Sequence, residues 1–194
     1  HRIKFELVTD LGTTQINLPL IGLHNVMNAL AAAAVARALD LSLEHIKDGL
    51  ESIKAVNMRM EIKVGKNGSK IIDDSYNANP VAMQRAIDVL VKQLGKKIMV
   101  IGDMLELGVD AEKQHRLLGQ QAKTAGIDML LAFGNLSKLA VTEFGDNAIF
   151  YAEKDRLIAD LTAMLDSDTV VLVKGSRGMR LNEVVDAVVS EAKD

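Results

Sequence analysis

The amino-acid sequence predicts an α/β fold: a Rossmann-like, doubly wound sheet of mostly parallel strands, preceded by a smaller unit with a different pattern. From residue 60 onward, short continuous apolar runs alternate with amphipathic helical segments, as in parallel sheets covered by helices on both faces. Polar clusters follow several of these runs, at the strand ends where open α/β sheets bind ligands. We therefore expect one domain over residues 1–56 and a second, Rossmann-like domain over residues 57–194.

The composition is that of a globular protein with a sizeable core, since 48% of the 194 residues are hydrophobic and 25% are charged. The net charge of −3 offers no basic surface for nucleic acid. The absence of cysteine excludes disulfides and thiolate metal sites. No apolar run approaches the roughly 18 residues of a membrane span, and the first residues alternate like a strand rather than a signal peptide. We expect a cytoplasmic protein that binds neither nucleic acid nor membrane.

The first 56 residues predict a hairpin and two helices. Residues 1–20 alternate apolar and polar side chains around a turn at 10–12, and a hairpin of this kind needs a larger sheet to be stable. An alanine-rich helix is expected over residues 25–39, and Ser42 is the expected N-cap of the next helix. Helical spacing predicts that the first helix buries Met27, Leu30, Ala31, Ala34, Val35 and Ala38.

Residues 55–59 lack periodicity and are the expected linker. After them, the Asn67-Gly68 pair predicts a hairpin between strands at 60–64 and 70–72. Asn79 is the expected cap of a helix from Pro80 to Leu94. The other expected strands are 98–101, 129–133, 148–151 and 169–173, and the other expected helices are 111–125, 137–144, 155–165 and 181–192.

Two asparagines mark the start of the alanine-rich helix. Asn25 and Asn28 share one helix face, where their amides could read the donor and acceptor edge of a purine. A simple N-cap at Asn25 is the alternative. An asparagine inside a helix, such as Asn28, is unfavourable and favours the functional interpretation.

The densest polar stretch runs from Asp73 to Pro80, between a strand and a helix. Asp74 could accept hydrogen bonds from a ribose diol, and the helix N-terminus at Pro80 favours anions. Alternatively, Asp73 or Asp74 caps a turn.

The loop Gly102–Gly108 also follows a predicted strand. Asp103 and Glu106 could converge there with His115, although a lone histidine of this kind is usually an ordinary surface residue. The loop lacks G-x-G-x-x-G, so a dinucleotide site is not expected.

The basic loop Lys174–Gly178 follows the last predicted strand. Arg177 offers a bidentate fork and Lys174 a point charge, which suits a carboxylate or a phosphate; a flexible basic turn is the alternative. The sequence contains no P-loop, no Cys/His metal set and no legible Ser-His-Asp order. No catalytic residue is certain, and His115 and Lys174 are the candidates.

Five ordered motifs resemble those of the Mur ligases over nearly the whole chain. The forms at 76–79 and 174–177 are most similar to the family member that adds D-alanyl-D-alanine. The motifs are G-x-H-N-x-x-N-x-x-A-A at 22–32, Arg59 after the linker, D-D-S-Y-N-A-N-P at 73–80, G-D-M-x-E-L-G at 102–108 with His115 following, and K-G-S-R at 174–177.

The resemblance implies a three-domain ligase in which residues 1–56 end the central ATPase domain and residues 57–194 form the C-terminal domain. The P-loop, most Mg²⁺ ligands and the UDP-binding domain would precede His1, so that the chain alone would be an inactive fragment. In the implied reaction, ATP phosphorylates the carboxylate of UDP-N-acetylmuramoyl-tripeptide. The amine of D-Ala-D-Ala then attacks the acyl phosphate, and an amide forms. A monomer is expected.

The resemblance also implies roles for individual residues and leaves two alternatives: a sister Mur-type or folylpolyglutamate ligase, or a non-catalytic Rossmann-like nucleotide-binding module. The cofactors implied are ATP and Mg²⁺, with no metal ligand in this chain. The implied ATP-binding residues are Asn25 and Asn28 at adenine, Arg59 near the domain hinge and Asp74 at ribose. The implied substrate-binding residues are Tyr76, Asn77 and Asn79 along the cleft, Lys174, Ser176 and Arg177 at the dipeptide, and Asp103 and Glu106.

Overall fold

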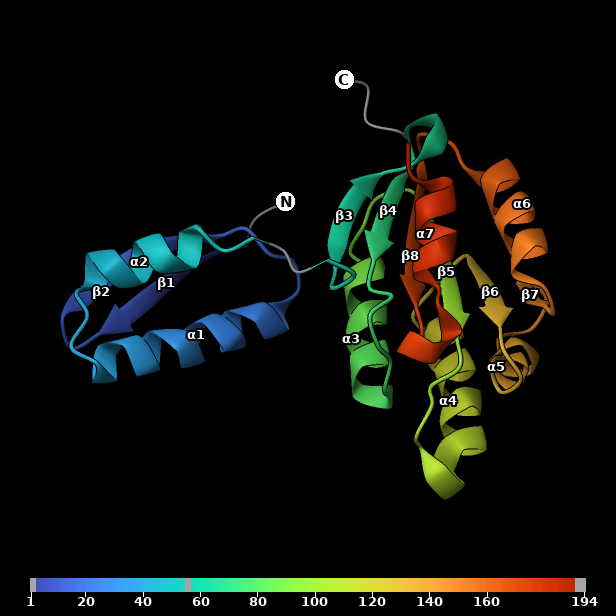
Figure 1. The fold of residues 1–194 in the computed structure, drawn as a ribbon, viewed down its shortest axis with the longest axis horizontal. Coiled ribbons are helices and arrows are strands. Elements are labelled where there is room, and N and C mark those ends of the chain that lie inside the picture. Colours follow the sequence, from blue (N-terminus) through green and yellow to red (C-terminus); the bar gives the residue numbers. More distant parts are fainter. Residues whose placement is uncertain (1–2, 55–56, 191–194) are drawn as a thin grey trace. The chain divides into compact units, whose positions relative to one another are not determined.

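The computed structural model describes residues 3–54 and 57–190 (Figure 1). The chain divides into two compact units, His1–Val56 and Asn57–Asp194. Of the expected linker, Ala55 and Val56 lie outside the described residues, as do the first two residues of the expected hairpin. The expected closing helix 181–192 is too long, because the helix ends at Val188 and Val189 forms an antiparallel bridge with Gly65; residues 191 and 192 lie outside the described residues.

The first unit is an antiparallel hairpin with two helices. Strands β1 (Ile3–Thr9) and β2 (Gly12–Leu18) pair from Ile3 opposite Leu18 to Thr9 opposite Gly12. Helices α1 (Leu23–Ala38) and α2 (Leu43–Glu51) follow, and the Ser42 hydroxyl caps α2 by accepting from the His45 amide at 3.2 Å. The small core that results comprises Leu7, Ile16, Leu18, Ala29, Ala33, Ile46 and Leu50.

The predicted buried stripe of α1 is wrong. The helix buries Ala29 and Ala33, whereas Met27 is 65% exposed and Val35 is 62% exposed. The helix carries no Asp, Glu, Lys or Arg before Arg37, so that more than one apolar stripe satisfies helical spacing. Alanines permit a closer approach of the helix to the hairpin. The larger side chains are left on an exposed apolar face.

The second unit confirms the predicted Rossmann-like sheet, which has six strands in the order β3-β4-β8-β5-β6-β7. The first pair is antiparallel, and its connection uses positive φ angles of 56° at Asn67 and 79° at Gly68. All other pairs are parallel. The strands are β3 (Glu61–Val64), β4 (Lys70–Asp73), β5 (Lys96–Gly102), β6 (Met129–Phe133), β7 (Ala148–Tyr151) and β8 (Thr169–Lys174).

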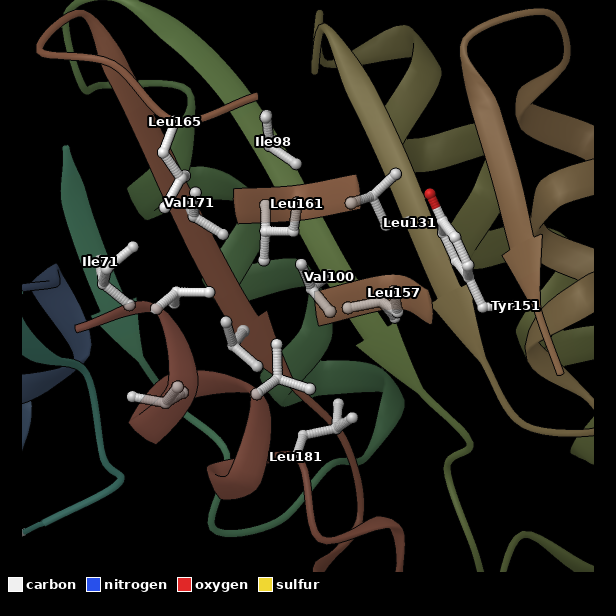
Figure 2. Packing of buried hydrophobic residues seen from close by; sticks show 14 residues of the cluster. Ile71, Ile98, Val100, Leu131, Tyr151, Leu157, Leu161, Leu165, Val171 and Leu181 are labelled. Atoms are coloured by element: carbon white, nitrogen blue, oxygen red, sulfur yellow. The ribbon is translucent and has the colours of Figure 1, made fainter. Parts of the chain in front are cut away.

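Helices cover both faces of this sheet. The connections through α3, α4 and α5 run one way along the sheet and the connection through α6 runs back, so right-handed crossovers put the two sets on opposite faces. Figure 2 shows Leu157 and Leu161 of α6 over Val100 and Val171 of the sheet, in a core that α7 also joins. The helices are α3 (Pro80–Leu90), α4 (Ala111–Thr124), α5 (Ser137–Phe144), α6 (Lys154–Met164) and α7 (Asn182–Val188).

Helix α3 ends at Leu90 rather than at the expected Leu94, which is 91% exposed. The cause is the entry into β5, where Gly95 has φ 92° and a Cβ on it would lie 2.0 Å from the carbonyl oxygen of Asp168. The chain must therefore leave the helix early to pair with the strand next to it. Among the described residues, no helix is long and apolar enough to cross a membrane.

Close packing of α4 on α5 gives a first testable prediction. A Cβ added to Gly119 would lie 2.2 Å from the Ala140 carbonyl oxygen, so Gly119→Ala should destabilise the protein by about 1–3 kcal/mol despite better helix propensity. The control is Gly49→Ala in α2, where nothing lies within 4 Å, and it should stabilise by about 0.5–1 kcal/mol. Thermal unfolding of both variants is the measurement, and a raised Tm for Gly119→Ala would contradict the packing.

Candidate functional site

Three of the four polar clusters lie at one edge of the six-stranded sheet. Strands β4, β8 and β5 are parallel neighbours, with Asp73 opposite Val173 and Ile101 opposite Lys174. Their carboxyl ends therefore coincide, and the loops that begin at Asp74, Gly175 and Asp103 lie side by side. This is the edge at which open α/β sheets bind ligands.

A buried ion pair joins two of these loops. The Lys174 ammonium donates to Asp74 Oδ2 at 2.6 Å and to the Asn77 carbonyl oxygen at 2.8 Å. The Lys174 side chain is 4% exposed and the Asp74 side chain 11%. The other Asp74 oxygen accepts from the Met60 amide at 3.1 Å. The pair thus holds the end of β8, the loop after β4 and the segment before β3 in one arrangement.

Asp73 has the turn-capping role that was one alternative for these acids. Its Oδ1 accepts from the Ser75 hydroxyl at 2.6 Å and from the Ser75 amide at 3.2 Å. Its Oδ2 accepts from Lys63 at 2.8 Å, and Glu61 lies 3.3 Å from the same ammonium. Burial disfavours the charge on Lys63, but the hydrogen bond to Asp73 and the Glu61 charge outweigh it and raise the pKa of Lys63.

Asp103 and Ser176 tie the loop after β5 to its neighbours. The Asp103 carboxylate accepts from the Ser137 amide and hydroxyl, both at 2.7 Å, and from the Leu136 amide at 3.1 Å, so it satisfies the start of α5. The Asp103 carbonyl accepts from the Ser176 amide at 3.1 Å, and the Ser176 hydroxyl accepts from the Leu105 amide at 2.9 Å. Both residues are buried, so both position loops in this structure.

His115 is fully buried, and its interpretation as an ordinary surface residue is wrong. Its ring contacts the Ala111 carbonyl oxygen at 2.7 Å and the Met104 amide at 2.9 Å. The loop Gly102–Gly108 folds over α4 and covers the ring. The sequence held a signal for this burial, because His115 shares a helical stripe with Leu118 and Ala122.

Above this buried layer lies a set of exposed polar side chains. The guanidinium carbon of Arg59 lies 4.4 Å from the centre of the Tyr76 ring, at a distance that allows a cation–π interaction. Arg177 Nη1 lies 3.0 Å from the sulfur of Met58. The exposed members of the predicted site are Arg59, Tyr76, Asn77, Asn79, Glu106 and Arg177.

Met58 and Met60, which the sequence analysis did not identify, flank Arg59 and fix the backbone around it. Met58 and Met60 have φ angles of 62° and 51°, in the left-handed region that costs a side-chain-bearing residue on the order of 1–3 kcal/mol. The Tyr76 amide donates to the Met58 carbonyl at 3.1 Å, and the Met60 amide donates to Asp74. These bonds fix the strained segment. No pattern in the sequence indicates positive φ at a methionine.

Asn25 and Asn28 belong to the first unit, at the start of α1. Asn25 donates its amide to the Ile21 carbonyl at 2.8 Å and accepts from the Asn28 amide at 3.2 Å. Asn79 caps α3 as expected, accepting from the Ala82 amide at 2.8 Å. Within the described ranges, no group of three or more His, Cys, Asp or Glu side chains is arranged to hold a metal ion.

The fold defines a Rossmann-like domain preceded by a small α/β unit. We call the polar, two-layered edge formed by the loops that begin at Asp74, Asp103 and Gly175 the rim. Residues 58–177 match the family model "Mur ligase, glutamate ligase domain". The chain belongs to the Mur ligase family.

Several similar proteins within the family have the same activity in their names. The UDP-N-acetylmuramoyl-tripeptide–D-alanyl-D-alanine ligase of Escherichia coli K12 is 41% identical over 191 residues, which is 97% of this chain and 42% of that protein. The crystal structure of MurF from Acinetobacter baumannii superposes with a TM-score of 0.87 at 33% identity, over 95% of this chain and 41% of that one. MurF from Thermotoga maritima, in complex with ADP, gives 0.84 at 26% identity, over 96% and 43%. The chain thus spans about two fifths of the relatives it matches.

The buried pair yields a second prediction. Lys174→Met should destabilise the second unit by about 3–5 kcal/mol, because it leaves the Asp74 charge buried without its cation. The added change Asp74→Asn should recover part of this loss, since an amide oxygen can still accept from Met60. Arg156→Ala, at an exposed pair with Asp160, should change little. Urea unfolding at neutral pH measures all three, and equal losses for Lys174→Met and Arg156→Ala would contradict the assignment.

Proposed function

We propose that this chain works as part of an ATP-dependent amide ligase that adds D-alanyl-D-alanine to UDP-N-acetylmuramoyl-tripeptide. The observation that carries the proposal is 41% identity to a ligase of that name over 97% of this chain, a match that spans both units. Because the chain spans only part of its relatives, the activity is assigned to the full-length protein.

In the proposed reaction, ATP phosphorylates the tripeptide carboxylate. The amine of the dipeptide attacks the acyl phosphate, a tetrahedral intermediate forms, and phosphate leaves as the amide is made. The acyl phosphate must be protected from water, which a ligand rim closing on an ATP-binding domain would achieve. We assign Mg²⁺ and its ligands to the part of the ligase outside this chain.

For ATP, we assign Asn25 and Asn28 to adenine, Arg59 to the nucleotide and Asp74 to the ribose. The structure of MurF from Thermotoga maritima is a complex with ADP, and this relative supports nucleotide binding by the full-length ligase. Both Asp74 oxygens already accept hydrogen bonds. A carboxylate oxygen can accept more than one hydrogen bond, so these bonds are compatible with the assignment.

For the dipeptide, we assign Arg177 to the terminal carboxylate, which its planar fork can bind in a bidentate manner. Its exposure and its place on the rim support this role. Lys174, Ser176 and Asp103 act beneath it by fixing the loops, while Tyr76, Asn77, Asn79 and Glu106 line the cleft.

The first unit is proposed to be the end of the central ATPase domain. Its α1 helix exposes an apolar face that includes Leu23, Met27 and Val35, and a face of this size is normally covered. We propose that the rest of that domain covers it. The ligase is proposed to act as a monomer in the cytoplasm.

A panel of acceptors tests the function as a third prediction. The full-length protein should release phosphate from MgATP only when both UDP-N-acetylmuramoyl-tripeptide and an amine acceptor are present, and D-Ala-D-Ala should be the preferred acceptor. Single amino acids and glutamyl-folate serve as controls for the sister ligases. Preference for one of these would assign the protein to a sister activity, and the absence of ligation with nucleotide still bound would favour a binding module.

Arg177 gives a fourth prediction. Arg177→Ala in the full-length ligase should raise the KM for D-Ala-D-Ala on the order of 10- to 100-fold, as expected for the loss of a charge-assisted fork. Arg177→Lys should recover only part, because lysine lacks the second donor in plane. Arg180→Ala is the control, since Arg180 is exposed on the same turn but pairs with Glu183. Equal effects at positions 177 and 180 would remove Arg177 from the dipeptide site.

A further inference from the structure

The imidazole of His115 is buried beneath the rim, where it cannot touch a ligand. We propose that His115 is a positioning residue that holds the loop Asp103–Gly108 against α4 and, through that loop, fixes the turn that carries Arg177. The proposal rests on the ligase function proposed above, because Arg177 is there assigned to the dipeptide.

The two contacts of His115 determine its protonation state. A carbonyl oxygen can only accept, so Nδ1 must donate its hydrogen to Ala111, 2.7 Å away. A backbone amide can only donate, so Nε2 must accept from Met104, 2.9 Å away. Only the neutral ring with its hydrogen on Nδ1 satisfies both bonds. In a charged ring, Nε2 would carry a hydrogen that points at the Met104 N–H, so the hydrogen bond that holds the loop would be lost.

The loop held by His115 is bonded directly to the turn of Arg177. The residue after Met104 is Leu105, whose amide donates to the Ser176 hydroxyl at 2.9 Å, and the Ser176 amide returns a bond to Asp103 at 3.1 Å. A Cβ on Gly178 would lie 3.0 Å from Leu105 Cδ1, so the two loops are also packed together. A shift at Met104 therefore moves the residues on both sides of Arg177.

The same contacts occupy two of the loop's backbone amides. The consecutive amides of Met104 and Leu105 are both occupied by side chains, so neither is available to a phosphate. The next residue, Glu106, is exposed and has φ 65°, a left-handed conformation that persists only where its surroundings enforce it. His115 and Ser176 supply that constraint.

A spectroscopic measurement tests the geometry without any activity. In the ¹⁵N-labelled full-length ligase, His115 should show a neutral ring with protonated Nδ1 and bare Nε2 at neutral pH, and the Met104 amide should exchange slowly. A ring protonated on Nε2, or a rapidly exchanging Met104 amide, would overturn the proposal even if ligation were confirmed.

Kinetics of two variants test the consequence. His115→Phe keeps a ring but removes the acceptor, and it should raise the KM for D-Ala-D-Ala about 10-fold while the KM for ATP changes by less than about 2-fold. His115→Gln restores an acceptor for Met104 and should recover most of the dipeptide affinity. The control Leu161→Ala creates a cavity on the other face of the sheet and should lower Tm without changing the ratio of the two KM values.

Each kinetic outcome decides the proposal. A parallel rise in both KM values, or a change in the ratio with Leu161→Ala, would show that His115 acts through general stability only. If His115→Phe does not fold, His115→Gln and the ring spectrum remain decisive. A ligase with another amine substrate would refute the proposed function and leave the His115 measurements valid for that substrate.

Discussion

The ion pair between Lys174 and Asp74 is the constraint on which the ligand rim depends. Removing two charges from water costs several kcal/mol for each ion, and attraction within the pair offsets this only when the remaining polar atoms are also bonded. Here the Asn77 carbonyl accepts a second hydrogen bond from Lys174, and the Met60 amide donates to the second Asp74 oxygen. Such a pair adds little net stability but permits only one arrangement of three chain segments. The main effect of the ion pair is therefore to fix the positions of these segments.

That geometry separates the polar residues of the rim into two layers. The buried layer consists of groups that bond to one another and to backbone, so the loops are fixed before any ligand arrives. The exposed layer, with Arg59, Tyr76 and Arg177, is then presented by a rigid support. Ordering side chains and loops on binding costs about 0.5–1.5 kcal/mol for each immobilised side chain, and a preformed rim lowers that cost. The strained backbone at Met58 and Met60 is held by the same network.

The sequence predicted the fold well because the signals for it are local. Continuous apolar runs identified the parallel strands, and Asn79-Pro80 located the start of α3. Burial could not be predicted in the same way. Helix α1 is apolar on more than one face, so its periodicity could not select the stripe that packs on the hairpin.

For the site, the motifs identified the loops. They did not show which side chains in those loops bond within the protein and which stay exposed. The residues Asp74 and Lys174 are 100 positions apart, and nothing near either one indicates that they will neutralise each other. In the same way, Ser176 and Asp103 look like ligand-binding residues in the sequence, and only the alignment of β8 with β5 turns them toward one another. Motif spacing therefore defines a shared edge, while the register between distant strands decides which side chains remain for a ligand.

In the described part of the chain, the rim of the second unit and the exposed face of α1 in the first unit differ in chemistry. The rim of the second unit is polar, and its buried side chains of Asp74, Asp103, Lys174 and Ser176 are hydrogen-bonded, so it is stable in water and suits a ligand that binds reversibly. The exposed face of α1 is apolar, and burying each large side chain on it is worth about 1.5–3 kcal/mol. Exposure of such a face to water is unfavourable, so we expect the segment that covers it to stay bound. A transient substrate belongs at the rim, and a lasting intramolecular contact belongs at α1, as the proposed ligase requires.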